Sequence, residues 1–393
     1  MSTESGPADV SSLTELVLFI TGGDPFEMSC YLCSLSNSSR NTPPLSTSQQ
    51  TQLSTVTQTP EHMTKSLDNR ITRILADPGC EEFIIADAKD GDMGFGIAAP
   101  GPNSSNESSP FKSLEEYRQH MREITEQGLV DIMLMSPGTC EQLAIVEGIF
   151  DDSTVTPAAR ANDTTDIWLA LSGSYKDSPS LPFRTATINH IQTGNEAGEG
   201  PRRWTDLGLY SITFNNDAQL DAHALECYRE FRLEAERKGF RHFLEVFAPN
   251  ALVNPVEDVG RFVNDCIART LAGVPRASRP VFLKMPYFGP EAMSRLVHYD
   301  PTLIPGILGG SSGTTHDAFR MLWEAKKYGA RAALFGRKIN HSEHQLTFVR
   351  FLRELADGNI QPEEAVKAYH GELQKLDIQP HRSLTDDLTV TQF

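Results

Sequence analysis

The 393-residue chain lacks the features that mark several protein classes. It has no stripe of clustered lysine and arginine, and its formal net charge is −17. We therefore expect no binding to nucleic acid or to an anionic membrane surface, because both need concentrated positive charge. No apolar run is long enough to span a membrane. The apolar stretch "LTELVLFITGG" (13–23) has no basic segment before it, so we expect no signal peptide.

Cysteine is also scarce, and metal-ligand spacing is missing. Of six scattered cysteines, only Cys30 and Cys33 form a C-x-x-C, and no second pair completes a zinc site. His341 and His344 lie close together, but no H-E-x-x-H occurs, so we interpret the histidines as surface and helix-cap residues. These patterns indicate a reducing compartment, for which the cytoplasm is the expected location, and no metal is expected.

The chain divides into three regions by composition. From 34 to 60 it is mostly Ser, Thr, Gln, Asn and Pro, so we expect 1–62 to be a disordered or low-complexity extension. An ordinary globular pattern starts at Met63, and one hypothesis is that the functional protein begins there. We expect a catalytic domain over 63–380 and a C-terminal tail over 381–393.

After Met63, short apolar runs alternate with stretches of helical period. Eight such runs with intervening crossovers predict an α/β fold, the TIM (β/α)8 barrel. A doubly wound open sheet is the alternative, but the first run is not followed by a G-x-G-x-x-G turn. The predicted strands are 83–87, 130–135, 167–173, 207–214, 242–247, 280–287, 304–310 and 332–336.

A candidate anion site follows the last two predicted strands. "ILGGSSGTTHDAF" runs from a strand through glycine and hydroxyl residues into a helix, where free backbone N–H groups favour negative charge. The next strand ends in Gly336-Arg337, where an arginine can hold an oxyanion. In TIM barrels these two loops commonly bind phosphate. The predicted phosphate-binding residues are Gly309, Gly310, Ser311, Ser312, Gly313, Thr314, Gly336 and Arg337.

The most informative residue is a lysine in "RPVFLKMPYFG" (279–289). Lys284 ends an apolar strand, and a lysine in such a place is either a strand-end residue that reaches water or a desolvated nucleophile. With a phosphate site two strands away, the second interpretation predicts a Schiff base with a phosphorylated carbonyl compound. Asp87, Glu245 and Tyr287 stand at or near strand ends and could transfer protons. Lys89 could pair with Asp87 or Asp92, or, if it faces inward, lower the pKa of Lys284 by charge repulsion.

The sequence resembles the DeoC/FbaB group of class I aldolases, in particular archaeal-type fructose-bisphosphate aldolases and their autoinducer-2 aldolase/thiolase relatives. The resemblance lies in "FLKMPY", "ILGGSSGTT" and "ALFGRKI". It implies a TIM barrel, a covalent Schiff base on Lys284 without another cofactor, and phosphate contacts from the glycine loop and Arg337. It also implies an acidic residue after the first strand, for which Asp87 is the match, and a homo-oligomer. The expected partner is a small phosphorylated carbonyl substrate.

Two alternatives remain open at this point. Asp87, Lys89 and Asp92 spell D-x-K-x-x-D, which resembles the charged array of the orotidine-monophosphate and keto-gulonate-phosphate decarboxylases. That chemistry would use the array and no Schiff base. A barrel that binds a phosphorylated metabolite without catalysis is the other alternative.

Overall fold

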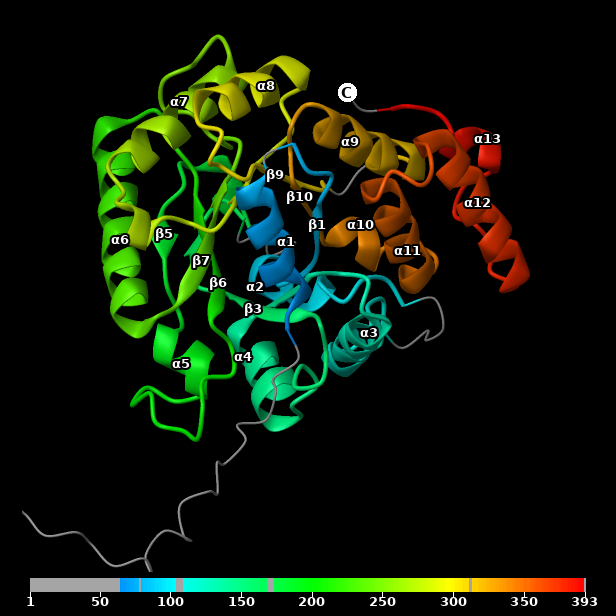
Figure 1. Ribbon diagram of the computed structural model, residues 1–393, viewed down its shortest axis with the longest axis horizontal. Coiled ribbons are helices and arrows are strands. Elements are labelled where there is room, and N and C mark those ends of the chain that lie inside the picture. Colours follow the sequence, from blue (N-terminus) through cyan, green and yellow to red (C-terminus); the bar gives the residue numbers. More distant parts are fainter. Residues whose placement is uncertain (1–63, 78, 104–108, 168–172, 311–312, 392–393) are drawn as a thin grey trace, which may run out of the picture. The chain divides into compact units, whose positions relative to one another are not determined.

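Eight parallel strands form a closed barrel in the computed structural model, which describes residues 64–77, 79–103, 109–167, 173–310 and 313–391 (Figure 1). The strands are β1 (Ile84–Lys89), β2 (Ile132–Met135), β3 (Thr156–Arg160), β6 (Leu207–Ile212), β7 (Arg241–Val246), β8 (Leu283–Lys284), β9 (Gly306–Leu308) and β10 (Ala332–Phe335). They pair in the order β8-β7-β6-β3-β2-β1-β10-β9. Between β8 and β9, the N–H of Leu308 donates to the carbonyl of Met285 at 2.9 Å and closes the ring. The predicted TIM barrel is confirmed, and the open sheet is excluded.

Seven of the eight predicted strands lie where the apolar runs placed them, and the third was wrong. The run 167–173 is not that strand: Ile167 lies in a turn, and 168–172 lie outside the described residues. The third barrel strand is β3, which pairs with β2 and β6. Its sequence, TPAAR, offers a proline and small side chains instead of an apolar run. The antiparallel hairpin of β4 (Asp163–Thr164) and β5 (Pro182–Phe183) follows it.

Helices and helical turns join the strands and surround the barrel (Figure 1). Several of the helices begin with a side-chain cap in the first turn. Ser113 and Glu116 form a capping box at the start of α3. The helices and turns are α1 (Ser66–Ala76), α2 (Asp92–Phe95), η1 (Gly96–Ala98), α3 (Leu114–Gln127), α4 (Pro137–Cys140), η2 (Glu141–Val146), η3 (Tyr175–Asp177), α5 (Ile188–Thr193), α6 (Ala218–Lys238), α7 (Val259–Ala272), η4 (Arg276–Ser278), α8 (Pro290–Tyr299), α9 (Thr315–Lys327), α10 (Arg337–Asn340), α11 (Gln345–Ala356), α12 (Pro362–Lys375) and α13 (Leu384–Asp387).

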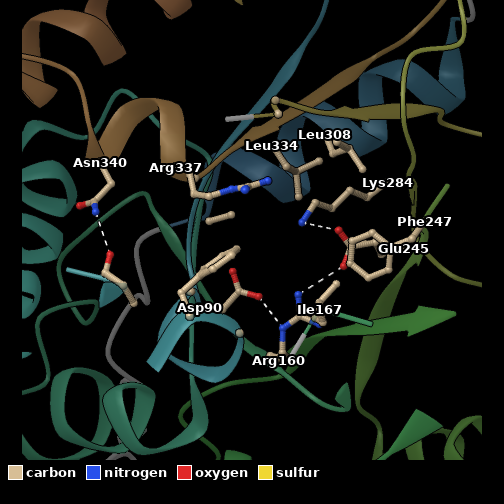
Figure 2. A pocket seen from close by; sticks show the side chains of 18 of the residues that line it. Asp90, Arg160, Ile167, Glu245, Phe247, Lys284, Leu308, Leu334, Arg337 and Asn340 are labelled. Carbon is tan, nitrogen blue, oxygen red and sulfur yellow. Dashed lines mark hydrogen bonds and ion pairs between the residues drawn. The ribbon is translucent and has the colours of Figure 1, made fainter. Parts of the chain in front are cut away.

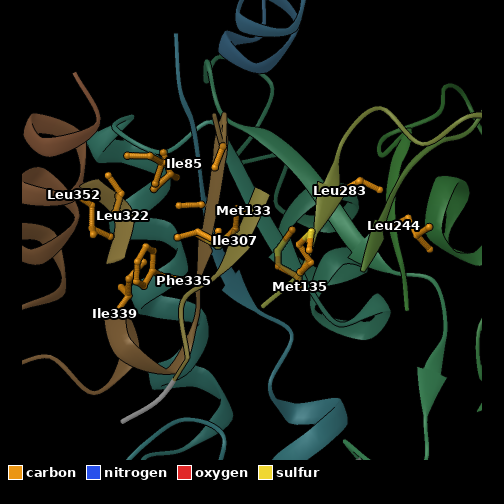
Figure 3. Close-up of a cluster of buried hydrophobic side chains, with 14 of the residues drawn as sticks. Ile85, Met133, Met135, Leu244, Leu283, Ile307, Leu322, Phe335, Ile339 and Leu352 are labelled. Carbon is orange, nitrogen blue, oxygen red and sulfur yellow. The ribbon is translucent and has the colours of Figure 1, made fainter. Parts of the chain in front are cut away.

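Two hydrophobic layers show which face of each strand points inward. One layer fills the barrel and includes Ile84 and Ala86 of β1, together with Leu67 of α1, which closes one end. The other layer lies between the strands and the outer helices and includes Ile85 (Figure 3). Side chains alternate along a strand, so in β1 the even-numbered positions point into the barrel and the odd-numbered ones point out. This alternation decides which polar residues reach the interior.

The C-terminal segment packs against the first turn of α9. Asp387 accepts a hydrogen bond from the backbone N–H of Thr315 at 2.7 Å, and Thr391 donates its N–H to Asp317 at 2.9 Å. The predicted tail over 381–393 is therefore folded onto the barrel's outer helices as far as Thr391. The predicted extension over 1–62 lies outside the described residues. None of the described helices is long and apolar enough to cross a membrane.

Candidate active site

A cavity of about 140 Å³ lies at the carboxyl ends of the barrel strands (Figure 2). It receives side chains from strands on all sides of the ring and from the loops that follow them. Its lining consists of Ala88, Asp90, Gly91, Gly94, Phe95, Ala99, Tyr117, Arg160, Ile167, Glu245, Phe247, Lys284, Leu308, Gly309, Gly310, Leu334, Gly336, Arg337 and Asn340. This is the end of the barrel at which TIM-barrel enzymes place their active sites.

Lys284 lies inside the barrel and reaches this cavity. Its strand, β8, pairs with β7 so that Lys284 and Glu245 are direct neighbours on the same face. The ammonium nitrogen of Lys284 is 2.7 Å from Oε1 of Glu245, and the two residues are 6% and 1% exposed. The apolar run before Lys284 buries the side chain, and the pairing with β7 supplies the partner that a buried lysine needs. Two of the predicted site residues are thus brought together.

Arg160 connects Glu245 to a second carboxylate. Its Nε donates to Asp90 at 2.6 Å and its Nη2 donates to Oε2 of Glu245 at 3.3 Å. Ser211 accepts from Arg160 at 3.0 Å and donates to the same Glu245 oxygen at 2.7 Å. Oε2 of Glu245 is therefore held by two groups, while Oε1 faces Lys284. The carboxylate is fixed in position with one oxygen directed at the amine.

The electrostatics of this network keep Asp90 ionised. Burial alone would raise the pKa of Asp90, but the positive charges of Arg160 and Lys284 hold that pKa below its usual range. The pKa of Arg160 is raised, because the neighbouring carboxylates outweigh the effect of its burial. Neither Asp90 nor Arg160 was among the predicted site residues. The missed strand carried no apolar run, so no signal marked Arg160 as a strand-end residue.

Asp87 and Lys89 lie on the outer face of β1 and do not line the cavity. They form a fully buried ion pair at 3.2 Å, and Lys89 also donates to Gln345 of α11 at 2.8 Å. Burial raises the pKa of Asp87 to about 6, against the opposing charge of Lys89. Their place between the strand and the outer helices gives this pair a structural role. The acidic residue of β1's end that does reach the cavity is Asp90.

Tyr287 also lies outside the cavity lining. It packs against the outer hydrophobic layer, and its hydroxyl donates to Glu324 of α9 at 3.1 Å. Burial and the charge of Glu324 raise the pKa of Tyr287. The residue helps to attach α9 to the barrel, and its hydroxyl is already engaged.

The predicted anion site is partly assembled at the cavity. Gly309, Gly310, Gly336 and Arg337 all line it. A Cβ at Gly309 would lie 2.1 Å from the Phe335 ring, and one at Gly336 would lie 2.4 Å from the carbonyl oxygen of Ala88. Both positions therefore require glycine for packing, independently of any ligand.

Arg337 is the cation that faces this side of the cavity. Figure 2 shows Arg337 and Lys284 extending into the same space toward one another. The guanidinium of Arg337 lies 4.9 Å from the centre of the Phe95 ring, and among the described residues no carboxylate forms an ion pair with it. Partial burial lowers the pKa of Arg337. An arginine held in this way can accept an anion as its partner.

Of the other predicted phosphate-binding residues, the two that the structure describes, Gly313 and Thr314, do not line this cavity. Thr314 caps α9 and donates its hydroxyl to the carbonyl of Thr389, while its N–H donates to Asp317 at 2.8 Å. The first turn of α9 is thus satisfied by carboxylates of this chain. Gly313 lines a separate hollow beside Lys338. Ser311 and Ser312 lie outside the described residues.

Two further carboxylates, the buried Asp163 and the partly buried Asp92, lie close to this network. Burial raises the pKa of Asp163 to about 6, although Arg160 at 4.0 Å works against this effect. Burial also raises the pKa of Asp92, whose Oδ2 accepts a hydrogen bond from Ser136 at 2.6 Å. In the part of the chain that the structure describes, no three His, Cys, Asp or Glu side chains form a group that could hold a metal ion.

Similarity to known proteins was found at the level of structure. No protein-family model matches the chain, and no curated protein sequence matches it. A fructose-bisphosphate aldolase from Slackia heliotrinireducens aligns with a TM-score of 0.57 and 13% identity, over 77% of this chain and 89% of that one. An archaeal fructose 1,6-bisphosphate aldolase aligns with a TM-score of 0.52 and 15% identity, over 74% of this chain and 100% of that one. A Schiff base forming fructose-1,6-bisphosphate aldolase aligns equally well, with 17% identity over 74% of this chain and 99% of that one. At these identities, the similarity shows that the chain shares its barrel fold with these aldolases.

Proposed function

We propose that the protein is a class I, Schiff-base aldolase-type lyase that breaks or forms a C–C bond in a small phosphorylated sugar or ketone. One observation carries the proposal: a lysine amine inside the barrel faces the cavity and contacts a fixed carboxylate at 2.7 Å. A buried amine next to a proton acceptor is the arrangement that nucleophilic catalysis by lysine requires. The shared fold with Schiff-base aldolases supports the same assignment.

The reaction begins at Lys284. Its amine gives a proton to Glu245 and attacks the substrate carbonyl carbon through the nitrogen lone pair, while the carbonyl oxygen takes up a proton. That oxygen receives a second proton, the one that Glu245 took from Lys284, and leaves as water when the lone pair forms the C=N bond of the iminium. The bond between the α and β carbons then breaks, its electron pair forms the C=C bond of an enamine as the C=N electrons move to nitrogen, and a base removes the proton of the hydroxyl on the departing β carbon. The enamine that remains is protonated on carbon and hydrolysed by water, which releases the product and restores Lys284.

Glu245 is assigned the proton transfers next to the nitrogen, because its Oε1 contacts Lys284. Asp90 is a poorer proton acceptor, since Arg160 lowers its pKa, and its negative charge instead stabilises the iminium. Arg337 binds the phosphate, and the backbone of Gly309, Gly310 and Gly336 lines the same space. The mechanism uses a covalent Schiff base and no further cofactor. A homo-oligomer and a cytoplasmic location stay predictions.

The decarboxylase-like alternative does not fit this geometry. It requires Asp87, Lys89 and Asp92 to converge on one substrate, whereas Asp87 and Lys89 lie on the outer face of β1. A purely binding barrel would leave Lys284 unmodified by any carbonyl compound, so an experiment separates it from the lyase.

The proposal is tested by reductive trapping followed by intact-mass measurement. The full chain is incubated with dihydroxyacetone phosphate and then reduced with borohydride. We expect one covalent adduct per chain in the wild-type protein and none in Lys284→Met. Lys326→Met is the matched control, because Lys326 is also a largely buried lysine paired with a glutamate, Glu81, at 2.8 Å, but on an outer helix. Equal adduct formation by wild type and K284M, or no adduct in the wild type, contradicts the proposal.

A further inference from the structure

The charged side chains of the cavity leave one positive charge without a partner. Three cations and two carboxylates line it. Lys284 pairs with Glu245, and Arg160 pairs with Asp90 and Glu245. Arg337 remains, and among the described residues no carboxylate forms an ion pair with it. The three internal segments outside the described residues, 104–108, 168–172 and 311–312, contain no lysine or arginine. They therefore add no second cation to the cavity.

Several polar groups of the lining are also engaged within the protein. The amide of Asn340 donates to the carbonyl of Ala99 at 2.9 Å. The guanidinium of Arg160 is shared among Asp90, Glu245 and Ser211. A substrate with many hydroxyl groups would have to displace such contacts, because a buried polar group needs a hydrogen-bond partner.

Apart from Tyr117 and the glycines, the remaining side chains of the lining are apolar. Leu308 and Leu334 lie next to Lys284, Phe247 lies beside Glu245, and Ile167 lies beside Arg160 (Figure 2). The cavity volume, about 140 Å³, is well below the roughly 300–1,000 Å³ of pockets that enclose drug-sized ligands. Space, charge and lining together fit a short compound with one anionic end.

We propose that the substrate carbonyl compound carries a single anionic group, bound by Arg337, and an otherwise short and largely apolar chain that contacts Phe247, Ile167 and the leucines. A sugar bisphosphate is excluded from this class, because its second phosphate would meet no free cation and would be desolvated without compensation. The inference rests on the proposed function for the reacting carbonyl, but the binding preference itself is independent of the chemistry.

The test uses ligands without a carbonyl group, so that no Schiff base can form. Butyl phosphate has one phosphate and an apolar chain, and glucitol 1,6-bisphosphate has two phosphates and hydroxyl groups. Isothermal titration calorimetry measures their binding to the full chain, to Arg337→Gln and to Lys338→Gln. Lys338 is the matched control, because it is the next residue of α10 but donates to the carbonyl of Gly313 beside a different hollow.

We expect butyl phosphate to bind at least about 10-fold more tightly than the bisphosphate, and R337Q to weaken it by about 10-fold or more, the size of one charge-assisted contact. K338Q should change its affinity by less than about 3-fold. Pentanoate, tested in parallel, shows whether the single anionic group is a phosphate or a carboxylate. Tighter binding of the bisphosphate, or butyl phosphate affinity unchanged in R337Q, overturns the inference. In that case, a borohydride-trapped adduct on Lys284 would still support the proposed function. Absence of that adduct would contradict the proposed function and would not bear on the binding preference.

Discussion

The charge of Glu245 should control how fast Lys284 reacts, and Glu245→Gln tests this dependence. The variant keeps the size of the side chain and can still hydrogen-bond with Ser211, which lies 2.7 Å from Oε2 in the wild type. It removes the proton acceptor 2.7 Å from the amine. It also leaves three cations and one carboxylate in the cavity, so the cavity becomes more positive.

The expected loss follows from the two functions of that carboxylate. A positioned proton acceptor contributes about 10²–10⁴-fold to rate, or about 3–5 kcal/mol of activation free energy. We therefore expect the rate of adduct formation with dihydroxyacetone phosphate, followed by quenching with borohydride at timed intervals, to fall by about that factor. The loss of a buried ion pair will also lower the free energy of unfolding, so urea unfolding must show that E245Q is folded under the assay conditions.

Glu324→Gln is the matched control for this substitution. Glu324 accepts a hydrogen bond from Tyr287 at 3.1 Å on the outer side of the barrel, away from the cavity lining. Its replacement should leave the rate of adduct formation within about 2-fold, since no group of the site touches it. If folded E245Q forms the adduct within about 3-fold of the wild-type rate, Glu245 is not the proton acceptor and the assignment is wrong.

Three further predictions concern the stability of the fold and the part of the chain that is needed for folding. Arg160→Met should lower the free energy of unfolding by about 3–5 kcal/mol, because it leaves Asp90 buried without its partner; a loss below about 1 kcal/mol in urea unfolding would show that the network contributes little. The pKa of Asp163 is raised to about 6 in the folded chain from 3.8, so the folded state binds more protons between these values and stability should fall as pH rises from about 4 to about 6. The difference corresponds to about 3 kcal/mol, and Asp163→Asn should remove that part of the pH dependence; identical stability profiles for the two proteins would refute the assignment. A chain that begins at Met63 should unfold cooperatively and form the same adduct, because α1, which closes the barrel, starts after that point; failure of this chain to fold would end the hypothesis of a start near Met63.

The barrel was predictable because its signal is repeated along the chain. Runs such as Phe83–Asp87 and His242–Phe247 each contain the apolar side chains that a strand buried on both faces requires. The strand Thr156–Arg160 was not predicted, because its sequence contains alanines and a proline instead of large apolar residues. Pairing with the neighbouring strands, and not local preference, makes this segment a strand. With that strand, Arg160 was lost from the predicted site.

The sequence also did not reveal in which direction the side chains at strand ends point. A shift of one residue turns a side chain from the interior to the outer face, so Asp87 and Asp90 have opposite places although both follow the same apolar run. In a parallel barrel both faces of a strand are apolar, and the sequence therefore does not reveal which positions point inward. Lys284 and Glu245 were both named as strand-end residues, but that they stand side by side on paired strands is visible only in the register of β7 and β8.

The lysine at the end of β8 is the centre of this account, and peptide mass spectrometry after reductive trapping tests it most directly. Wild-type protein is treated with dihydroxyacetone phosphate and borohydride, digested, and each lysine is examined for the added mass. The account predicts modification at Lys284 before any other lysine, including the buried Lys89 and Lys338 of α10. Modification that begins at another lysine, or that spreads evenly over the exposed ones while Lys284 stays unmodified, would contradict it.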